Sequence, residues 1–362
     1  MPLKATEGFY RLKVRSVRQD TRDSVIVNFE VPAELQEKFR FVQGQFVTLR
    51  AWIDGHPVRR SYSICSAVQD GVLRLGVKRT PGGVFSNWII DQVKPGCELE
   101  VMPPEGRFHV KLCPSNAKNY VAFAAGSGIT PVFSLIKTTL LTEAKSTFTL
   151  FYGNRASSTI MLREELADLK DQFLDRFSLI YVMTREQQDL DLLNGRITGE
   201  KSKLLLEWFC RFQQIDTVFL CGPQQMIDDV SQALKRMGFQ DSQIKIELFT
   251  VEGSQRSAPR APAKAADAQC QVIIRVDGVQ HAFAMPKDTE PILRAALNRG
   301  IDLRHSCQSG VCGTCRAKLV SGKVDMDAAY ALEEYEIARG FILTCQSYPV
   351  TDEVTIDFDQ DS

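Results

Sequence analysis

Four cysteines near the C-terminal end of this 362-residue sequence have a spacing that suits a metal site. Cys307, Cys312 and Cys315 lie in "CQSGVCGTC", and Cys345 completes the pattern Cys-x4-Cys-x2-Cys-x29-Cys. Glycines and small polar residues between them let the loop wrap closely, so that backbone N–H groups can donate to sulfur. Four thiolates can bind zinc, ferrous iron or an iron–sulfur cluster, so the spacing has to distinguish these groups.

The spacing favours a [2Fe-2S] cluster. Structural zinc sites usually pair two short Cys-x2–4-Cys motifs, whereas this sequence has one, between Cys312 and Cys315. A redox-active pair of these two cysteines would leave the other two unexplained. Three closely spaced cysteines followed by a distant fourth are typical of plant-type [2Fe-2S] proteins, and this segment resembles a plant-type ferredoxin domain. We therefore predict that all four cysteines are cluster ligands, with zinc as the alternative.

A glycine-containing loop earlier in the sequence suits the phosphates of a nucleotide. In "FAAGSGITPVFSLI", Gly126 and Gly128 separate an apolar strand from a helix that begins near Thr130. Glycine lets the backbone approach a pyrophosphate, and the N-terminus of the helix stabilises its charge. Pro131 stands where the common dinucleotide fingerprint has its third glycine, so this is not the standard motif.

Two motifs nearer the N-terminus suit a flat ring and its phosphates. In "RRSYSIC", Arg60 can clamp a pyrophosphate, Tyr62 can stack on a ring, and Ser63 can hydrogen-bond that ring. In "GGVFSNWI", a glycine-rich start precedes a predicted helix whose N-terminus can cradle a phosphate. The residues predicted for that cradle are Gly83, Val84 and Ser86.

The elements that must position these residues fall into four segments. Residues 1–113 alternate apolar and polar positions between turn residues, which predicts a small antiparallel β-barrel. Residues 114–251 alternate short apolar runs with helix-like stretches, which predicts an α/β domain with a parallel sheet. Residues 252–268 are rich in Ala and Pro and predict a flexible linker. Residues 269–362 predict a β-grasp-like ferredoxin domain that begins with a hairpin turning at Asp277 and Gly278.

Composition excludes several classes of protein. The 44 basic and 44 acidic residues cancel, which argues against a nucleic-acid binder. No apolar run is long enough to span a membrane, and the start of the sequence lacks the apolar stretch of a secretory signal. We therefore expect no membrane partner and a cytoplasmic location, where clustered cysteines bind metals more often than they form disulfides.

Together the motifs of residues 8–251 resemble the ferredoxin-NADP reductase family. "RSYS" at Arg60 matches its flavin motif, "GVFS" at Gly83 its phosphate motif, and "GSGITP" at Gly126 its pyridine-nucleotide loop. The resemblance implies FAD on the barrel and a nicotinamide nucleotide on the α/β domain. It further implies a catalytic site of Ser63 near the flavin with Cys221 and Glu247 beside the nicotinamide. The same resemblance adds three cofactor-binding residues near that site, namely Gly222, Pro223 and Phe249.

Two arginines bear on the choice between NADPH and NADH. Arg155 follows the second strand of the α/β segment, and Arg185 follows the third. An NADP site usually offers cations near the ribose, whereas an NAD site offers a carboxylate. We therefore predict NADPH rather than NADH. The alternative is that Arg155 only covers the adenine.

The order of the segments predicts a path for electrons. A nicotinamide donates two electrons at once as a hydride, whereas a [2Fe-2S] cluster accepts one, so a flavin has to stand between them. With the local stretches "GITPVFSLIKTTLLTE", "FTLFYGNR" and "DLLNGRITGEK", this order of domains resembles the family of reductases that serve multisubunit di-iron oxygenases, and the resemblance implies a partner that epoxidises the ring of phenylacetyl-CoA. The alternatives are a reductase for a steroid or Rieske-type hydroxylase, and a stand-alone NAD(P)H oxidase or ferric reductase.

Overall fold

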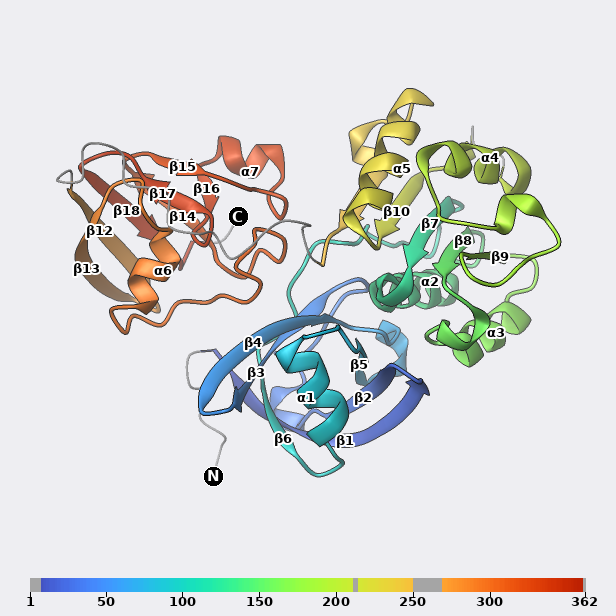
Figure 1. Cartoon of the computed structure of the whole chain (residues 1–362), viewed down its shortest axis with the longest axis horizontal. Coiled ribbons are helices and arrows are strands. Elements are labelled where there is room, and N and C mark those ends of the chain that lie inside the picture. The colour runs from blue at the N-terminus through green and yellow to red at the C-terminus, as the bar shows by residue number, and fades with distance from the viewer. Residues whose placement is uncertain (1–7, 211–213, 250–268, 361–362) are drawn as a thin grey trace. The chain divides into compact units, whose positions relative to one another are not determined.

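The computed structural model describes residues 8–210, 214–249 and 269–360, and its contacts divide the chain into two compact units (Figure 1). The first unit comprises Phe9–Glu247 and contains both the barrel and the α/β domain. The second comprises Leu248–Ser362 and contains the four cysteines. The predicted linker, residues 252–268, lies outside the described residues, and the predicted domain boundaries remain predictions.

The N-terminal domain is an antiparallel sheet of six strands in the order β4-β3-β6-β1-β2-β5. An isolated bridge between Ile64 and Leu75 joins the chain just after β4 to β5, so the two outer strands approach each other and the predicted barrel is confirmed. The strands are β1 (Tyr10–Thr21), β2 (Ser24–Glu30), β3 (Phe46–Ile53), β4 (His56–Ser63), β5 (Leu73–Lys78) and β6 (Glu98–Val101).

The barrel has its own apolar core, closed by the single helix α1 (Val84–Gln92). Leu12 and Val14 on β1 are buried while their neighbours are exposed, as the period of two requires for a strand with one face inward. Phe85 and Ile89 lie four residues apart on α1, so both side chains point into this core. The helix that was predicted to cradle phosphate is thus fixed to the barrel by its apolar side.

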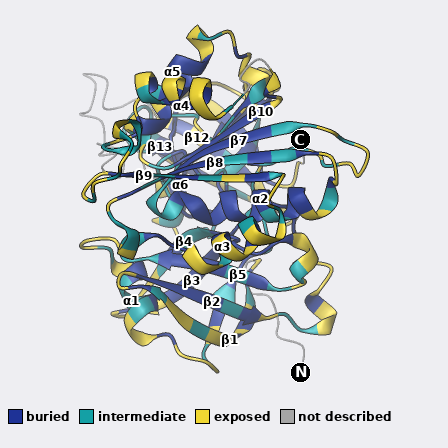
Figure 2. Ribbon diagram, turned by 90° about the vertical axis from the view of Figure 1, so that its right-hand side faces the viewer, coloured by how far each residue is buried: buried dark blue, intermediate teal, exposed yellow. Residues whose placement is uncertain are grey.

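The α/β domain is a parallel sheet in the order β11-β10-β7-β8-β9. Helices α4 and α5 cover one face and α2 and α3 cover the other, and Figure 2 shows the strands between them as largely buried. Burial on both faces explains why these strands are continuous apolar runs in the sequence. The strands are β7 (Asn119–Ala125), β8 (Thr147–Asn154), β9 (Phe177–Met183), β10 (Thr217–Cys221) and β11 (Ile244–Glu247), and the helices are α2 (Ile129–Thr142), α3 (Arg163–Gln172), α4 (Gly199–Phe209) and α5 (Gln224–Arg236).

The second unit has a five-stranded mixed sheet in the order β13-β12-β18-β14-β16 and a separate pair of strands, β15 and β17. Its first strand, β12, pairs in parallel with its last strand, β18, and antiparallel with β13. The β12–β13 hairpin turns at Asp277 and Gly278, both with positive φ, as predicted. Its elements are β12 (Gln269–Val276), β13 (Val279–Pro286), α6 (Ile292–Leu297), β14 (Arg316–Ser321), β15 (Val324–Met326), α7 (Glu334–Ala338), β16 (Phe341–Leu343), β17 (Ser347–Pro349) and β18 (Glu353–Asp357).

This arrangement of sheet and helix agrees with the predicted β-grasp-like ferredoxin domain. Among the helices of the described ranges, none is long and apolar enough to cross a membrane.

Candidate functional site

The barrel half of the site lies at the end of β4. Arg60 and Tyr62 are partly exposed, whereas Ser63 is buried. The ring of Tyr62 lies against Phe85 of α1, with centroids 6.0 Å apart. Burial raises the pKa of Tyr62, so its hydroxyl stays protonated and can act as a hydrogen-bond donor. The structure therefore brings the predicted flavin motif directly beside the predicted phosphate helix.

The N-terminus of α1 forms a compact turn without a capping side chain. Gly83 is the N-cap residue, and its backbone N–H donates to the carbonyl of Thr80 at 2.9 Å. The hydroxyl of Ser86 accepts from the N–H of Thr80 at 3.1 Å. A Cβ atom on Gly83 would lie 2.8 Å from the Ser86 hydroxyl, so glycine keeps this cradle open. Such a helix N-terminus suits a phosphate, as the predicted FAD requires.

The nucleotide half depends on two glycine loops that interlock at the ends of β7 and β10. A Cβ atom on Gly128, in the turn η3 (Gly126–Gly128), would lie 2.1 Å from the carbonyl oxygen of Cys221. A Cβ atom on Gly222 would lie 2.7 Å from the Met226 side chain and 3.1 Å from Ala125. Each loop fills the space in which a side chain of the other would lie. The glycine backbone is therefore not covered by side chains, as the approach of a pyrophosphate requires.

The structure gives Thr130 a role that the sequence did not predict. Thr130 is buried, and its hydroxyl donates to the carbonyl of Ser127 at 2.9 Å. Its methyl group lies where a side chain on Gly76 of β5 would be, 2.5 Å from the position of a Cβ atom. Thr130 therefore joins the glycine loop to the barrel, and its predicted contact with the nucleotide remains a prediction.

Cys221 and Glu247 end adjacent parallel strands, where they are paired in register. Burial raises the pKa of Glu247 to about 8. Burial also raises the pKa of Cys221, and the nearby Glu247 carboxyl adds to that rise. At neutral pH the pair is therefore an uncharged carboxylic acid beside an uncharged thiol. Pro223 is the N-cap of α5 next to this pair, and Phe249 lies two residues beyond β11, partly exposed.

Lys78, which the sequence prediction left out, completes the nucleotide half together with Tyr152 and Asn154 of the segment "YGNR" that leads to Arg155. The Lys78 ammonium, at the end of β5, lies 3.7 Å from the position of a Cβ atom on Gly126. The hydroxyl of buried Tyr152 donates to the carbonyl of Gly126 at 2.9 Å. Asn154 is buried, yet neither atom of its amide has a hydrogen-bond partner among the described residues. A cation and an unsatisfied amide beside this loop fit a nucleotide.

The signal for Lys78 was its position at the end of a predicted strand. That position does not reveal that its side chain approaches the glycine loop, because the approach depends on how the barrel packs on the α/β domain.

Arg155 and Arg185 follow β8 and β9 and lie next to each other. The N–H of Arg185 donates to the carbonyl of Arg155 at 2.8 Å, and both side chains are exposed. Beside them, the carboxylate of Glu186 accepts from the N–H of Ser157 at 2.7 Å and from its hydroxyl. These two bonds lower the pKa of Glu186. The carboxylate is thus engaged with Ser157, while the two cations remain at the surface.

The four cysteines interact through their side chains. Cys307 interacts with Cys312 and Cys315 interacts with Cys345, and Cys307 also acts on Cys315. Across the described parts of the chain, no three His, Cys, Asp or Glu side chains converge as ligands of one metal ion. Thiols gathered in this way suit a group held by four thiolates, and the spacing in the sequence favours a [2Fe-2S] cluster over zinc.

The loop around these cysteines is shaped to surround a cluster. Gly310 and Gly313 have φ of 77° and 74°, which glycine adopts without strain. The N–H of Ser309 donates to the sulfur of Cys307 at 3.4 Å. The hydroxyl of Thr314 is buried and has no hydrogen-bond partner within the described ranges, so it is available to a cluster sulfur. The residues present therefore fit the cluster.

Three domain families match this chain in the predicted order. The oxidoreductase FAD-binding domain matches residues 11–110, the oxidoreductase NAD-binding domain matches residues 123–232, and the 2Fe-2S iron-sulfur cluster binding domain matches residues 274–350. FAD, a nicotinamide nucleotide and a [2Fe-2S] cluster are thus the cofactors that the chain accommodates.

Known proteins are similar to the chain over almost its whole length. One subunit of the 1,2-phenylacetyl-CoA epoxidase from Escherichia coli K12 is 43% identical over 97% of this chain and 98% of its own. The ferredoxin reductase component of 3-ketosteroid-9-alpha-monooxygenase from Rhodococcus rhodochrous is 33% identical over 96% of each. The solved structure of phthalate dioxygenase reductase has a TM-score of 0.58 at 24% identity, covering 97% of this chain and 98% of its own, which shows the shared fold.

Replacing Gly128 with alanine tests the interlocked loops. Because φ at Gly128 is ordinary, the cost comes only from the overlap of the new methyl group with the Cys221 carbonyl. We expect the KM for the nicotinamide nucleotide to rise on the order of 100-fold, measured by ferricyanide reduction. The control is Gly238→Ala, where φ of 96° strains alanine but a Cβ meets no atom, so it separates a general loss of stability from the overlap at the loop. Equal effects of the two substitutions would contradict the steric argument.

Replacing Cys312 with serine tests the thiol pairs. We expect the cluster bands to disappear from the visible spectrum and cytochrome c reduction to collapse, while the flavin domain still reduces ferricyanide. The matched control is Cys113→Ser, an exposed cysteine outside the pairs, which should retain the cluster. Iron and sulfide retained in Cys312→Ser with unshifted cluster bands would show that this cysteine is not a ligand, because a serine oxygen bound to iron in its place would shift those bands.

Proposed function

We infer a function from one premise, which is that this chain belongs to the family of oxygenase reductase components that combine an FAD domain, a nicotinamide-nucleotide domain and a [2Fe-2S] domain. It is an oxidoreductase that transfers electrons to an oxygenase. We propose that the donor is NADPH and that the partner is a multisubunit di-iron epoxidase acting on phenylacetyl-CoA. The observation that carries this choice of partner is the 43% identity to a phenylacetyl-CoA epoxidase subunit over nearly the whole chain.

The residues of the barrel hold the flavin in this proposal. Arg60 and the turn around Gly83 bind its pyrophosphate, while Tyr62 and Ser63 orient its ring. When bound, FAD converts the two-electron chemistry of a nicotinamide into the one-electron chemistry of an iron–sulfur cluster. The contact between Tyr62 and Phe85 keeps the ring-binding and phosphate-binding parts at a fixed separation. The barrel therefore contributes orientation rather than chemistry of its own.

Cys221 and Glu247 provide an uncharged floor beside the nicotinamide. A half-buried carboxylic acid whose pKa is raised to about 8 can donate a hydrogen bond at neutral pH without adding a negative charge near the reacting atoms. The neutral thiol next to it fills space and excludes water. We assign both residues the role of positioning the nicotinamide and holding a proton at the Glu247 carboxyl.

The preference for NADPH rests on the groups that follow β8 and β9. Arg155 and Arg185 present two cations that suit the additional phosphate of NADPH. The one carboxylate beside them, Glu186, already accepts two hydrogen bonds from Ser157. It is therefore not positioned as the acceptor that a ribose hydroxyl of NADH would need.

A reconstituted reaction tests the proposed partner. The purified chain is mixed with the oxygenase subunits of a phenylacetyl-CoA epoxidase, NADPH and phenylacetyl-CoA, and the epoxide is measured. We expect product with the intact chain and none with Cys312→Ser, because the electrons must pass through the cluster. Product formation with the oxygenase of a 3-ketosteroid monooxygenase, and none with the epoxidase, would favour the steroid alternative.

Replacing Arg185 with alanine tests the preference for NADPH. Loss of a charged hydrogen bond to a phosphate costs about 1.5–3 kcal/mol, so the KM for NADPH should rise roughly 10- to 100-fold. The KM for NADH should change little, since NADH lacks that phosphate. Arg236→Ala, an exposed arginine at the end of α5, is the control. Parallel changes with both coenzymes would argue against this role.

The raised pKa of Glu247 predicts a dependence of stability on pH. Between the ordinary pKa of 4.5 and the folded value of about 8, the folded state binds more protons than the unfolded state. The free energy of unfolding therefore falls as the pH rises through this window, by at most about 1.4 kcal/mol per pH unit. We expect Glu247→Gln to flatten this slope in urea titrations between pH 5 and 8, and the exposed control Glu200→Gln to retain it.

A further inference from the structure

Leu162 has an unusual backbone conformation next to the nucleotide half of the site. It is the N-cap residue of α3, with φ of 57° and ψ of 31°, and its side chain is buried. A branched apolar residue adopts this left-handed conformation only under strain, so other contacts must hold it there. Strain of this kind concentrates at binding sites and at segments that have to keep one geometry.

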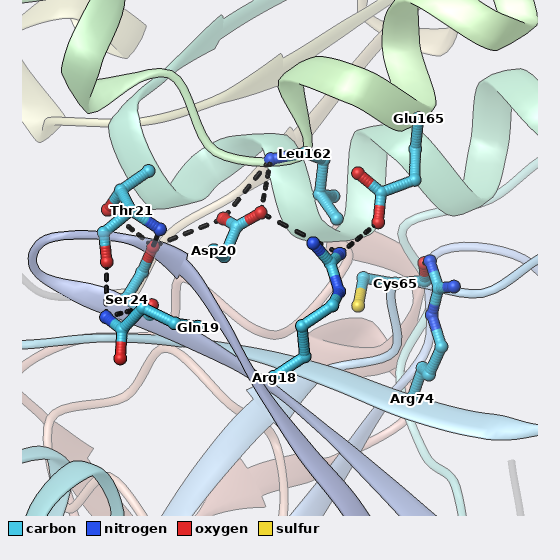
Figure 3. Close-up of polar contacts among 9 residues, drawn as sticks. All are labelled: Arg18, Gln19, Asp20, Thr21, Ser24, Cys65, Arg74, Leu162 and Glu165. Carbon is cyan, nitrogen blue, oxygen red and sulfur yellow. Dashed lines mark hydrogen bonds and ion pairs between the residues drawn. The ribbon is translucent and has the colours of Figure 1, made fainter.

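The contact that holds Leu162 comes from the FAD domain. Both carboxylate oxygens of Asp20, which lies where β1 turns into β2, accept the backbone N–H of Leu162 at 3.2 Å (Figure 3). The Asp20 side chain is only 4% exposed, and the hydroxyl of Ser24 donates to it at 3.2 Å. Nearby, Arg18 pairs with Glu165 in the first turn of α3. A buried carboxylate of one domain thus secures the start of a helix in the other.

The segment that Leu162 ends is the one that carries the nucleotide-facing cations. Residues 155–162 connect β8 to α3 and begin with Arg155. At its start, the segment is fixed by the bond from Arg185 to the Arg155 carbonyl and by Ser157 on Glu186. At its other end, the corresponding anchor is Asp20. The charges of Arg155 and Asp20 both act on Lys78, so this anchor lies close to the cations around the glycine loop.

We propose that Asp20 is a positioning residue for the nicotinamide nucleotide: by holding the strained Leu162 peptide, the β1–β2 turn of the FAD domain fixes segment 155–162 and thereby the place of Arg155. The proposal rests on the proposed function, because it assigns Arg155 to the nucleotide. Asp20 itself does not touch the nucleotide. Loss of the carboxylate leaves a buried N–H without its acceptor and lets Leu162 relax to an ordinary conformation. The end of segment 155–162 that carries Arg155 then shifts.

The experiment compares Asp20→Ala with Asp23→Ala in the full chain, because alanine removes every side-chain acceptor whereas asparagine would keep an oxygen for the Leu162 N–H. Asp23 lies three residues further on, between β1 and β2, is exposed and also acts on Lys78, so its replacement removes a similar charge without touching Leu162. Ferricyanide reduction is measured against NADPH and NADH. We expect Asp20→Ala to raise the KM for NADPH about tenfold and the KM for NADH less, with kcat within twofold. An unchanged KM, or an equal rise in Asp23→Ala, would overturn the proposal.

A second measurement keeps the test independent of activity. Amide hydrogen exchange of residues 155–166 should become faster in Asp20→Ala than in the unmodified chain, while exchange in β12 and β18 should stay the same. Unchanged exchange in this segment would also overturn the proposal. Failure of the unmodified chain to oxidise NADPH would instead refute the proposed function, so the two failures can be told apart. Flavin and cluster absorbance confirm that each variant has folded.

Discussion

The site depends on a contact between two pieces of backbone. Gly128 and the Cys221 carbonyl come so close that a single added methyl group would overlap the oxygen, and Gly222 closes against Ala125 in the same way. This contact needs adjacent parallel strands, because only then do the ends of β7 and β10 reach the same edge of the sheet. The glycine loop, the Cys221–Glu247 pair and the Tyr152 hydroxyl all take their places from it.

The second constraint is the seam between the barrel and the α/β domain. The methyl group of Thr130 packs against Gly76 on β5, in the space a side chain there would need. The hydroxyl of Ser134 on α2 donates to the carbonyl of Ser66 at 2.7 Å. Lys78 reaches the glycine loop across the same seam. The predicted flavin-binding and nucleotide-binding residues are thus held in one compact unit, and their separation is set by packing between the two domains rather than by either domain alone.

Sequence reasoning works for the parts of the site that are local. The glycine loops, the flavin motif and the first three cysteines each lie within a few residues, so their chemistry can be inferred from one short segment, and only Cys345 has to be joined to them from a distance. Lys78 escaped notice because its place at the glycine loop comes from a segment distant in sequence. The sequence also could not show that the Thr130 hydroxyl donates to the Ser127 carbonyl or that its methyl group packs against the barrel.

The parallel pairing of β12 with β18 has a consequence for biogenesis. These strands are the first and last of their unit, and all four cysteines lie between them in the chain. During synthesis the central pair of this sheet cannot form until the final strand has left the ribosome, and contacts so distant in sequence are slow to close. The four thiols therefore lie in an incomplete sheet until β18 has been made, so we expect a cluster to be enclosed only after β18 has paired with β12.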